Sequence, residues 1–389
     1  MPWKSSTPVD LRMEFVDRVM RGERVTDLCR EYGISRKTGD KFKQRFIRLG
    51  LPGLQDVSRA PRVIPHRTPP ELVEIIVAER KEHPTWGPKK VKEVLERRLE
   101  RALPAASTVG HILVRSGLVT PRKRRPHQRA RPTGLREATA PNDVWCIDYK
   151  GQFQLGDRSL CYPLTITDHF SRYILACEGM GAISDEAAKE VCEEIFRLRG
   201  LPSAMRSDNG SPFASTGLGG LTKLSVYWMR LGLVRERIRP GHPEENGRHE
   251  RMHRTLKFET TRPARSNLLQ QQERFDEFVD EFNCERPHEA LGMKRPSEVY
   301  QASPHPYPST LADLYYPEHD DAIRVRKDGK IYFSGQHIYI SSALIHEYVG
   351  IRERRDGSWL VTFMNLDLGY IDLDKKLKPI DVFTPPKAT

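Results

Sequence analysis

One stretch in the first half of the chain cannot belong to a packed core. Residues 120–140 read TPRKRRPHQRARPTGLREATA and hold three prolines within a dense run of basic side chains. No Asp or Glu occurs anywhere between Arg101 and Arg136. Such a segment lies extended and binds phosphate groups through Arg122, Lys123, Arg124 and Arg125, or it is a solvated tether, and both roles are compatible. It therefore divides the chain into parts that fold separately.

Changes of pattern on either side of this stretch define the expected domains, because 389 residues exceed one ordinary core. We expect a helix-turn-helix DNA-binding domain at 1–58, a second helix-turn-helix-like domain at 59–120, a basic linker at 121–140, an α/β catalytic core at 141–302, a linker at 303–320 and a small β-barrel at 321–385.

The first domain has the spacing of a helix-turn-helix. Residues 9–48 predict three short helices, with Thr26 capping the second, Gly33 at the sharp turn and Ser35 capping the third. The third helix would present Arg36, Lys37 and Lys41 to DNA. The alternative is a plain three-helix bundle with a basic surface, and the position of the glycine turn favours DNA binding.

The second helical domain gives a weaker signal. One helix is expected at about 71–82, a second restarts after Gly87 with Pro88 in its first turn, and a third starts at Ser107 or Thr108. A second helix-turn-helix and a purely structural bundle fit this pattern equally well.

Net charge and cysteine usage indicate which kind of molecule the protein binds and in which cellular compartment it is expected. The net charge of +12 favours a polyanion, nucleic acid first. The six cysteines are scattered and read as reduced thiols. We find neither a long apolar run nor a signal core, so no membrane segment is expected, and no Walker-type loop, so no nucleotide cofactor is expected. The expected location is the cytoplasm, with access to the chromosome.

From residue 142 the pattern changes to β-β-β-α-β-α-β-α, which predicts a mixed five-stranded sheet with helices on its faces. The helices are expected at 184–199, around 216–231, from Asn246 to about 260, and at 268–283. Farther on, Asp-Gly pairs at 328–329 and 356–357 lie between apolar runs, which is typical of hairpins and predicts the small barrel.

Two aspartates end strands of the middle domain. Asp148 lies at the end of the first strand, and Asp208 ends a later strand just before Asn209-Gly210. Because the carboxyl ends of neighbouring strands meet at one place in open α/β sheets, both side chains are expected there, where their hard oxygens suit Mg²⁺. Either residue taken alone is more often a turn former.

A third carboxylate comes from the run HPEENGRHERMHRTLK at 242–257. On a helix of about 100° per residue, Asn246, Arg254 and Lys257 share a face with Glu250, while Met252 and Leu256 point the other way. We prefer Glu250 as the metal ligand, because Glu244 and Glu245 lie where acids merely favour the helix dipole.

Other polar side chains near these motifs have plainer interpretations. Asp168 reads as a structural turn residue with Arg172 as its partner. His169, His249 and His253 lack metal-ligand spacing with any cysteine, so zinc is not expected.

These motifs resemble those of a known family. WCIDY, RSDNGSPF and HPEENGRHERMHRTLKFE look like the three acidic motifs of the DDE transposases of bacterial insertion sequences, whose core is shared with retroviral integrases and has a ribonuclease-H-like fold. The family places its glutamate three residues after an Asn-Gly or Gln-Gly pair, which here selects Glu250. The interval from Asp208 to Glu250 is slightly long, and the excess falls at 217–220.

The resemblance covers about residues 10–385 and implies a function. It implies a transposase that binds the terminal inverted repeats of a mobile element, cleaves its 3′ ends and joins them to target DNA. Two Mg²⁺ ions, with Mn²⁺ as an alternative, would be held by Asp148, Asp208 and Glu250, while Asn246, Arg254 and Lys257 contact DNA. The partners would be double-stranded DNA and further copies of the chain, as a dimer or a higher oligomer. The rival functions are a DNA-binding regulator with an inactive core and an integrase of phage or host with the same chemistry.

Overall fold

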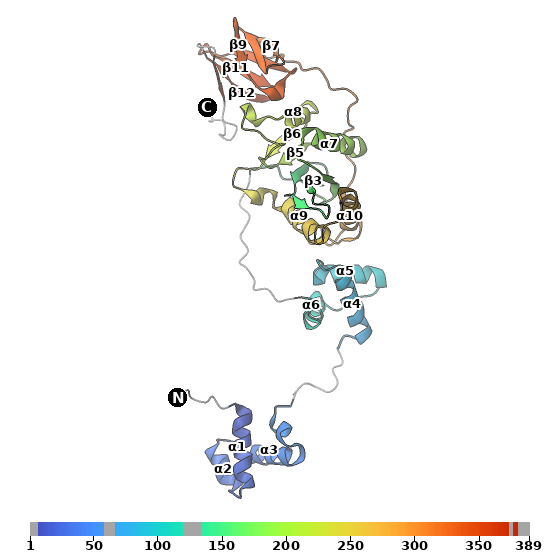
Figure 1. Cartoon of the computed structure of the whole chain (residues 1–389), viewed down its shortest axis with the longest axis vertical. Helices are drawn as coiled ribbons and strands as arrows, with labels where there is room; N and C mark the ends of the chain where they lie inside the picture. Colours follow the sequence, from blue (N-terminus) through green and yellow to red (C-terminus); the bar gives the residue numbers. More distant parts are fainter. Residues whose placement is uncertain (1–6, 58–66, 120–133, 373–375, 380–389) are drawn as a thin grey trace. The chain divides into compact units, whose positions relative to one another are not determined.

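The computed structural model describes residues 7–57, 67–119, 134–372 and 376–379. The chain separates into two compact units, Met1–Pro69 and Pro70–Thr389, whose elements are drawn in Figure 1. Among the described residues, no helix combines the length and the apolar character needed to cross a membrane.

The first unit is a three-helix bundle with a sharp turn before its last long helix. It contains α1 (Pro8–Met20), α2 (Val25–Glu31) and α3 (Arg36–Leu49), followed by a 3₁₀ turn at Leu51–Leu54. Gly33 has a φ of +63°, as a sharp turn requires. The core is formed by Phe15, Val16, Val19, Leu28, Cys29, Phe42 and Leu54.

One of the two predicted helix caps is confirmed and the other is wrong. The Ser35 side chain accepts a hydrogen bond from the Thr38 N–H, so this serine starts α3. Thr26 lies inside α2, whose N-cap is Arg24 without a side-chain hydrogen bond. The helix therefore starts before the threonine that was expected to cap it.

The second unit begins with another three-helix group: α4 (Pro70–Glu82), α5 (Pro88–Leu99) and α6 (Ala106–Arg115). The break before α5 and Pro88 in its first turn agree with the sequence. The third helix starts at Ala106, without a side-chain cap, rather than at Ser107 or Thr108. Three helices around a core of Trp86, Val91, Leu95 and Ile112 form the bundle.

This helical group contacts the α/β core through polar side chains. His83 Nδ1 lies 3.1 Å from a carboxylate oxygen of Glu281, and the Lys89 ammonium lies 3.0 Å from Glu289. The contacts are ion pairs and hydrogen bonds between surfaces, in contrast to the apolar packing inside each domain.

A mixed sheet forms the centre of the α/β core. Its path is β2-β3-β1-β5-β6, with β4 on the other edge of β3. The strands are β1 (Val144–Tyr149), β2 (Phe153–Gln154), β3 (Leu160–Asp168), β4 (Ile174–Met180), β5 (Ala204–Ser207) and β6 (Val234–Arg237). β1 runs antiparallel to β3 and parallel to β5. Five of these strands match the predicted mixed sheet, and the two-residue β2 is additional.

Helices cover both faces of this sheet (Figure 1). On one face, α7 (Asp185–Arg199) and α8 (Lys223–Arg230) share a core with Trp145 and Ile147 of β1. On the other face, α9 (Gly247–Thr260) and α10 (Leu268–Asp280) pack on apolar residues of β3 and β4. Because strand side chains alternate, Asp148 points to the α9 face.

Two helices of the core differ in extent from the prediction. The helix expected around 216–231 starts only at Lys223, because Thr222 caps it by accepting a hydrogen bond from the Ser225 N–H. The helix expected at 268–283 ends as α10 at Asp280 and continues as a π-helix at Glu281–Glu285. The chain between Ser207 and Lys223 is therefore mostly loop.

The extra residues of that loop have a structural role. A Cβ added at Gly219 would lie 3.2 Å from the side chains of Leu366 and Leu368 on the C-terminal sheet. The Arg235 guanidinium donates to the carbonyl oxygens of Gly219 and Gly220. The glycine segment that lengthens the interval before Glu250 is thus a docking point for the C-terminal domain.

The closed barrel predicted for residues 321–385 is not what the structure shows. One five-stranded sheet has the order β13-β12-β11-β10-β7, and β8 and β9 form a separate hairpin. The strands are β7 (Asp321–Arg324), β8 (Lys330–Phe333), β9 (Gln336–Tyr339), β10 (Tyr348–Glu353), β11 (Trp359–Phe363), β12 (Leu366–Ile371) and β13 (Leu377–Pro379). The sheet and the hairpin share one apolar core, to which the α/β domain contributes Leu221 and Val226. The strands are therefore held together by side-chain packing and not by closure into a barrel.

Candidate active site

Asp148 near the end of β1 and Asp208 directly after β5 occupy equivalent positions along two adjacent parallel strands. The register pairs Val144 of β1 with Ala204 of β5, and each aspartate lies four residues farther along the chain. Both aspartates therefore lie at the carboxyl ends of neighbouring parallel strands, at the same edge of the sheet. Asp208 also accepts a hydrogen bond of 3.0 Å from the Gly210 N–H, so it forms the turn as well.

Electrostatic interaction links all three predicted acids. The pKa of Asp148 is raised to about 7, first by burial and then by the negative charge of Asp208, with a smaller contribution from Glu250. The Lys150 ammonium and the Tyr149 N–H act in the opposite direction. A carboxyl group with this environment holds its proton near neutral pH unless a cation replaces it.

Glu250 lies in the first turn of α9 and is exposed. The two faces predicted for this helix are present, because Met252 and Leu256 are buried whereas Arg254 and Lys257 are exposed. Asn246 departs from the expectation: it is 3% exposed, so its side chain points into the protein and offers no surface to DNA.

The neighbouring glutamates have structural roles, although a different one from that expected for Glu245. Its side chain is buried and pairs with the Arg239 guanidinium at 2.6 Å, and it also accepts the Arg239 N–H. Glu244 is exposed and pairs with His242. Both residues precede α9, in the 3₁₀ turn Pro243–Asn246. Glu245 therefore holds the loop that leads into α9 by an ion pair, rather than by interaction with a helix dipole.

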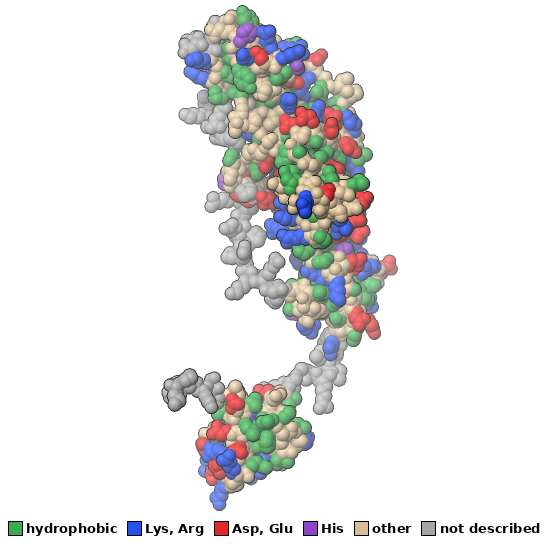
Figure 2. Space-filling view, in the orientation of Figure 1, with side chains coloured by type: hydrophobic (Ala, Val, Ile, Leu, Met, Phe, Trp, Pro, Cys, Tyr) green, Lys and Arg blue, Asp and Glu red, His purple; other side chains and the backbone are tan. Residues whose placement is uncertain are grey.

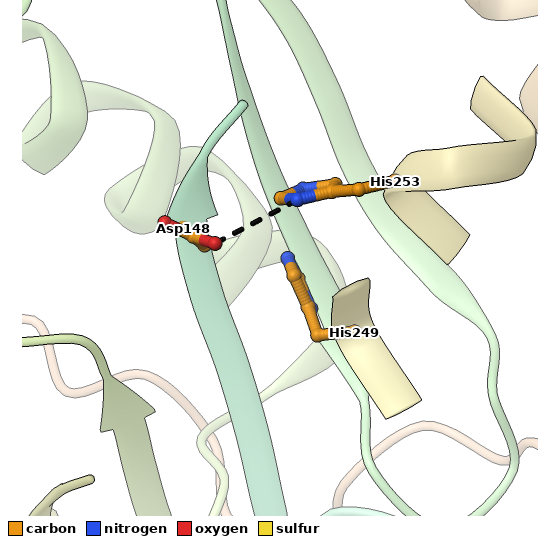
Figure 3. A group of neighbouring side chains, drawn as sticks. All are labelled: Asp148, His249 and His253. Carbon is orange, nitrogen blue, oxygen red and sulfur yellow. Dashed lines mark ion pairs between the residues drawn. The ribbon is translucent and has the colours of Figure 1, made fainter. Parts of the chain in front are cut away.

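Two histidines for which the sequence predicted no metal site lie beside Asp148 (Figure 3). One nitrogen each of His249 and His253 and one oxygen of Asp148 lie within 4.8 Å of one another. The imidazoles lie 2.8 and 2.6 Å from the Thr165 hydroxyl, respectively, and His253 Nδ1 is 3.6 Å from Asp148 Oδ2. The two histidines are four residues apart on α9, and this helical spacing was the signal in the sequence that could have paired them.

The Thr165 hydroxyl lies at the centre of the hydrogen bonds around this group. It is 3.1 Å from the Asp148 carbonyl oxygen and 2.8 and 2.6 Å from the Nε2 atoms of His249 and His253, and its single proton can be donated to only one of these three atoms. Burial lowers the pKa of His249 to about 3 and that of His253 well below its usual value, so both are neutral. His253 Nδ1 faces Asp148 Oδ2, and one proton between them, on the imidazole or on the carboxyl group, makes this contact favourable.

The same residues also spell His-Glu-x-x-His, a pattern typical of zinc peptidases. In such enzymes both histidines open onto a substrate cleft. Here His249 and His253 are only 2% and 3% exposed and contact threonine, while Glu250 lies on the outside of the helix. This geometry argues against a peptidase and for a supporting role of the histidines behind the carboxylates.

The predicted DNA-binding residues of the first unit lie on the surface. Arg36, Lys37 and Lys41 are exposed on α3, although Arg36 also lies 3.9 Å from Asp40. The basic residues Arg122, Lys123, Arg124 and Arg125 lie outside the described residues. On the face shown in Figure 2, basic side chains are mixed with acidic ones, so the surface in this view does not mark out a DNA-binding region.

Comparison with protein families identifies the domains. Residues 138–243 and 231–296 match two models described as integrase core domains, residues 38–113 match a homeodomain-like domain, and residues 11–62 match a helix-turn-helix domain. The middle of this chain, residues 138–296, thus matches the integrase core domain. Asp148, Asp208 and Glu250 all lie within the matched residues.

Individual relatives come from insertion elements and retroviruses. An uncharacterised protein of insertion element IS407 from Burkholderia multivorans is 27% identical over 168 residues, which cover 41% of this chain and 55% of the relative. The Pol polyprotein of feline endogenous virus ECE1 is 32% identical over 133 residues, covering 34% of this chain and 12% of the polyprotein. The chain thus spans about half the length of the insertion-element relative and a small part of the viral one.

Among solved structures, the HTLV-2 integrase catalytic core domain in complex with magnesium matches 42% of this chain and all of that chain. The sequence identity is 14% and the TM-score is 0.34.

Proposed function

We propose that the protein is a DNA transposase that binds the terminal inverted repeats of a mobile element, cleaves its 3′ ends and transfers them into target DNA. The observation that carries the proposal is the matched position of Asp148 and Asp208 at the carboxyl ends of two parallel strands, with Glu250 near enough to raise the pKa of Asp148. The integrase core, the helix-turn-helix domains and the insertion-element relatives support the same activity.

Two Mg²⁺ ions, with Mn²⁺ as an alternative, are the proposed cofactors, held by Asp148, Asp208 and Glu250. The donor set fits, because these are hard carboxylate oxygens and because Asp148 has a raised pKa among like charges. Bound Mg²⁺ supplies neutralisation of the charge that develops on the phosphate oxygens. His253 lies behind Asp148 and keeps its carboxylate oriented.

The reaction needs no covalent link to the protein. Water breaks the phosphodiester bond at the element end and leaves a 3′-OH, and that hydroxyl then attacks a target phosphodiester in the same site. Arg254 and Lys257 are exposed beyond Glu250 and are available to hold the DNA backbone. Two ends must be joined together, so a dimer or a higher oligomer on double-stranded DNA is part of the proposal. The bacterial insertion-element relatives support a cytoplasmic, chromosome-associated location.

Strand cleavage tests this function directly. The substrate is a set of end-labelled duplexes from the DNA flanking the coding segment, incubated with purified protein and Mg²⁺. We expect wild-type protein to nick one end and join it to target DNA, and Asp208→Asn to bind the duplex without nicking it.

The matched control is Glu244→Gln, which removes an exposed acid from the turn that precedes α9. This variant should nick and join at the wild-type rate. Nicking that survives in Asp208→Asn would remove the carboxylate site from the proposal. Specific binding without nicking by the wild-type protein would favour the rival function, a DNA-binding regulator.

A further inference from the structure

A basic cavity lies on the side of α9 away from Glu250. Its volume is about 70 Å³, which leaves room for more than one water molecule. The walls come from α9, the β3–β4 turn and the segment after the π-helix, and Lys90 of α5 completes them. The lining residues are Lys90, Thr167, Asp168, His169, Arg172, Arg248, His249, Arg251, Met252, Thr255, Phe282, Arg286 and His288.

Positive charge dominates this lining. Five Arg or Lys side chains surround the cavity, and Asp168 is the single acid among the lining residues. Three histidines also line it, but burial lowers the pKa of each, so they are neutral and add hydrogen-bonding groups rather than charge. The Asp168 carboxylate is already occupied, because it accepts hydrogen bonds from the Asn142 N–H, the Ser171 N–H and the Ser171 hydroxyl. Asp168, the partner expected for Arg172, therefore uses its carboxylate oxygens for hydrogen bonds within the β3–β4 turn.

Some of the basic groups have partners and others do not. Arg286 pairs with Glu259 at 3.0 Å, and Arg248 donates to the His169 carbonyl oxygen. By contrast, Arg172 Nη1 and His288 Nδ1 are buried and have no hydrogen-bond partner within the described part of the chain. Arg172 also has a φ of +66°, a conformation that side-chain-bearing residues rarely adopt. An unpartnered guanidinium nitrogen is costly to bury unless a ligand satisfies it.

Mutual repulsion adds to this cost. The pKa of Lys90 is lowered to about 8, first by burial and then by the charge of Arg286. That of Arg172 is lowered to about 10, first by burial and then by Arg248. Cations that lose affinity for their own protons when brought together are stabilised by an anion placed between them.

We propose that this cavity binds a phosphate group, either as free inorganic phosphate or as part of a DNA backbone. Guanidinium groups form charge-assisted hydrogen bonds with tetrahedral oxyanions, and several of them meet here around a cavity of suitable size. The lining includes Arg248, His249 and Arg251, the residues that flank Glu250 along the chain. A bound phosphate therefore steadies the first turn of α9, from which the Glu250 carboxylate extends.

Titration with inorganic phosphate tests the site without requiring activity. The full chain is titrated in chloride buffer at constant ionic strength, and binding is followed by calorimetry and by the rise in melting temperature. We expect saturable binding that is weakened about tenfold or more in Lys90→Gln, since one charge-assisted hydrogen bond is lost. Arg172→Gln should show the same loss, and Lys90→Gln keeps the test valid should the buried arginine variant fail to fold.

Lys89→Gln is the matched control, because Lys89 is the neighbour of Lys90, does not line the cavity and pairs with Glu289 instead. It should bind phosphate as the wild type does. The DNA arm measures duplex affinity against salt concentration. If the bound phosphate belongs to DNA, the slope of log affinity against log salt should be smaller by about 0.9 in Lys90→Gln but unchanged in Lys89→Gln. If the ligand is free inorganic phosphate, both variants should have the wild-type slope, and Lys90→Gln should still lose affinity for inorganic phosphate.

Two outcomes would overturn the proposal. One is the absence of saturable phosphate binding together with equal DNA slopes in all variants. The other is an equal loss in Lys89→Gln, which would mean that phosphate responds to net charge and not to this cavity. Neither outcome depends on strand cleavage, so the test is independent of the proposed transposase activity.

Discussion

Asp148 and Asp208 lie at the same level because β1 and β5 are parallel and in register, so the chain returns the second carboxylate to the level of the first 60 positions later (208 − 148). The intervening chain contains β3, β4 and α7, and none of these separates the two strands. The proximity of like charges is therefore built into the sheet topology and has consequences that can be measured.

The first consequence is a pH-dependent loss of stability. The pKa of Asp148 rises from an ordinary 3.8 to about 7 on folding. Its stabilising contribution is therefore complete below pH 4 and is lost as the pH rises through 7, because the folded state must then carry the buried charge. Asp148→Asn removes this loss. The free energy of unfolding of the variant, relative to that of wild type, should therefore rise by roughly 2–4 kcal/mol between pH 4 and pH 8.

Urea unfolding at both pH values, without divalent ions, measures that change. Glu244→Gln is the control and should show the same pH dependence as wild type. An unchanged difference between Asp148→Asn and wild type across this range would mean that Asp148 titrates normally.

Metal binding should release the same proton. Mg²⁺ must replace the proton of Asp148, so affinity should fall by about tenfold per pH unit below 7 and level off above it. Calorimetry in two buffers of different ionisation enthalpy counts the protons released. Asp208→Asn removes the neighbouring charge and one ligand, and it should show weaker binding with less proton release. If this variant released as many protons as wild type on binding Mg²⁺, the proposal that Asp148 and Asp208 share one metal site would be wrong.

The position of His253 predicts a positioning role. Its Nδ1 faces Asp148 at 3.6 Å, whereas His249 contacts Thr165 and Thr167. His253→Ala should reduce cleavage by roughly 10–100-fold and shift the midpoint of the pH profile set by Asp148. His249→Ala is the matched variant: it removes a similar buried imidazole from the same helix, and it should lose stability without shifting that midpoint. Equal pH profiles in the two variants would reduce His253 to a packing residue.

Much of this architecture could be predicted from local signals. The Ser35 cap, the Gly33 turn and the buried face of α9 depend on neighbours within a few residues, and the structure confirms them. Thr26 is not a cap because α2 starts before it, at Val25, and the N-cap residue Arg24 makes no side-chain hydrogen bond that marks this start in the sequence. Barrel closure also failed, because it depends on pairing between strands far apart in the sequence.

The histidines show the same limit within the candidate site. The helical angle of Glu250 could be calculated, but the sequence does not reveal that Thr165 and Thr167 of β3 lie opposite His249 and His253. Likewise, the basic cavity combines residues from α5, the β3–β4 turn and α9, which approach one another only in the folded chain.

DNA binding by α3 gives the last prediction. Lys37 and Lys41 are one turn apart on this helix, both exposed, and the sharp turn at Gly33 sets the helix at the surface of its unit. If each contacts a phosphate, Lys37→Gln and Lys41→Gln should each reduce the slope of log affinity against log salt by about 0.9. Arg30→Gln on α2 is the matched control, because it removes an equally exposed cation from outside the turn-to-helix face. Equal slope changes in all three variants would indicate a general charge effect, and the helix would then be a basic surface of an ordinary bundle.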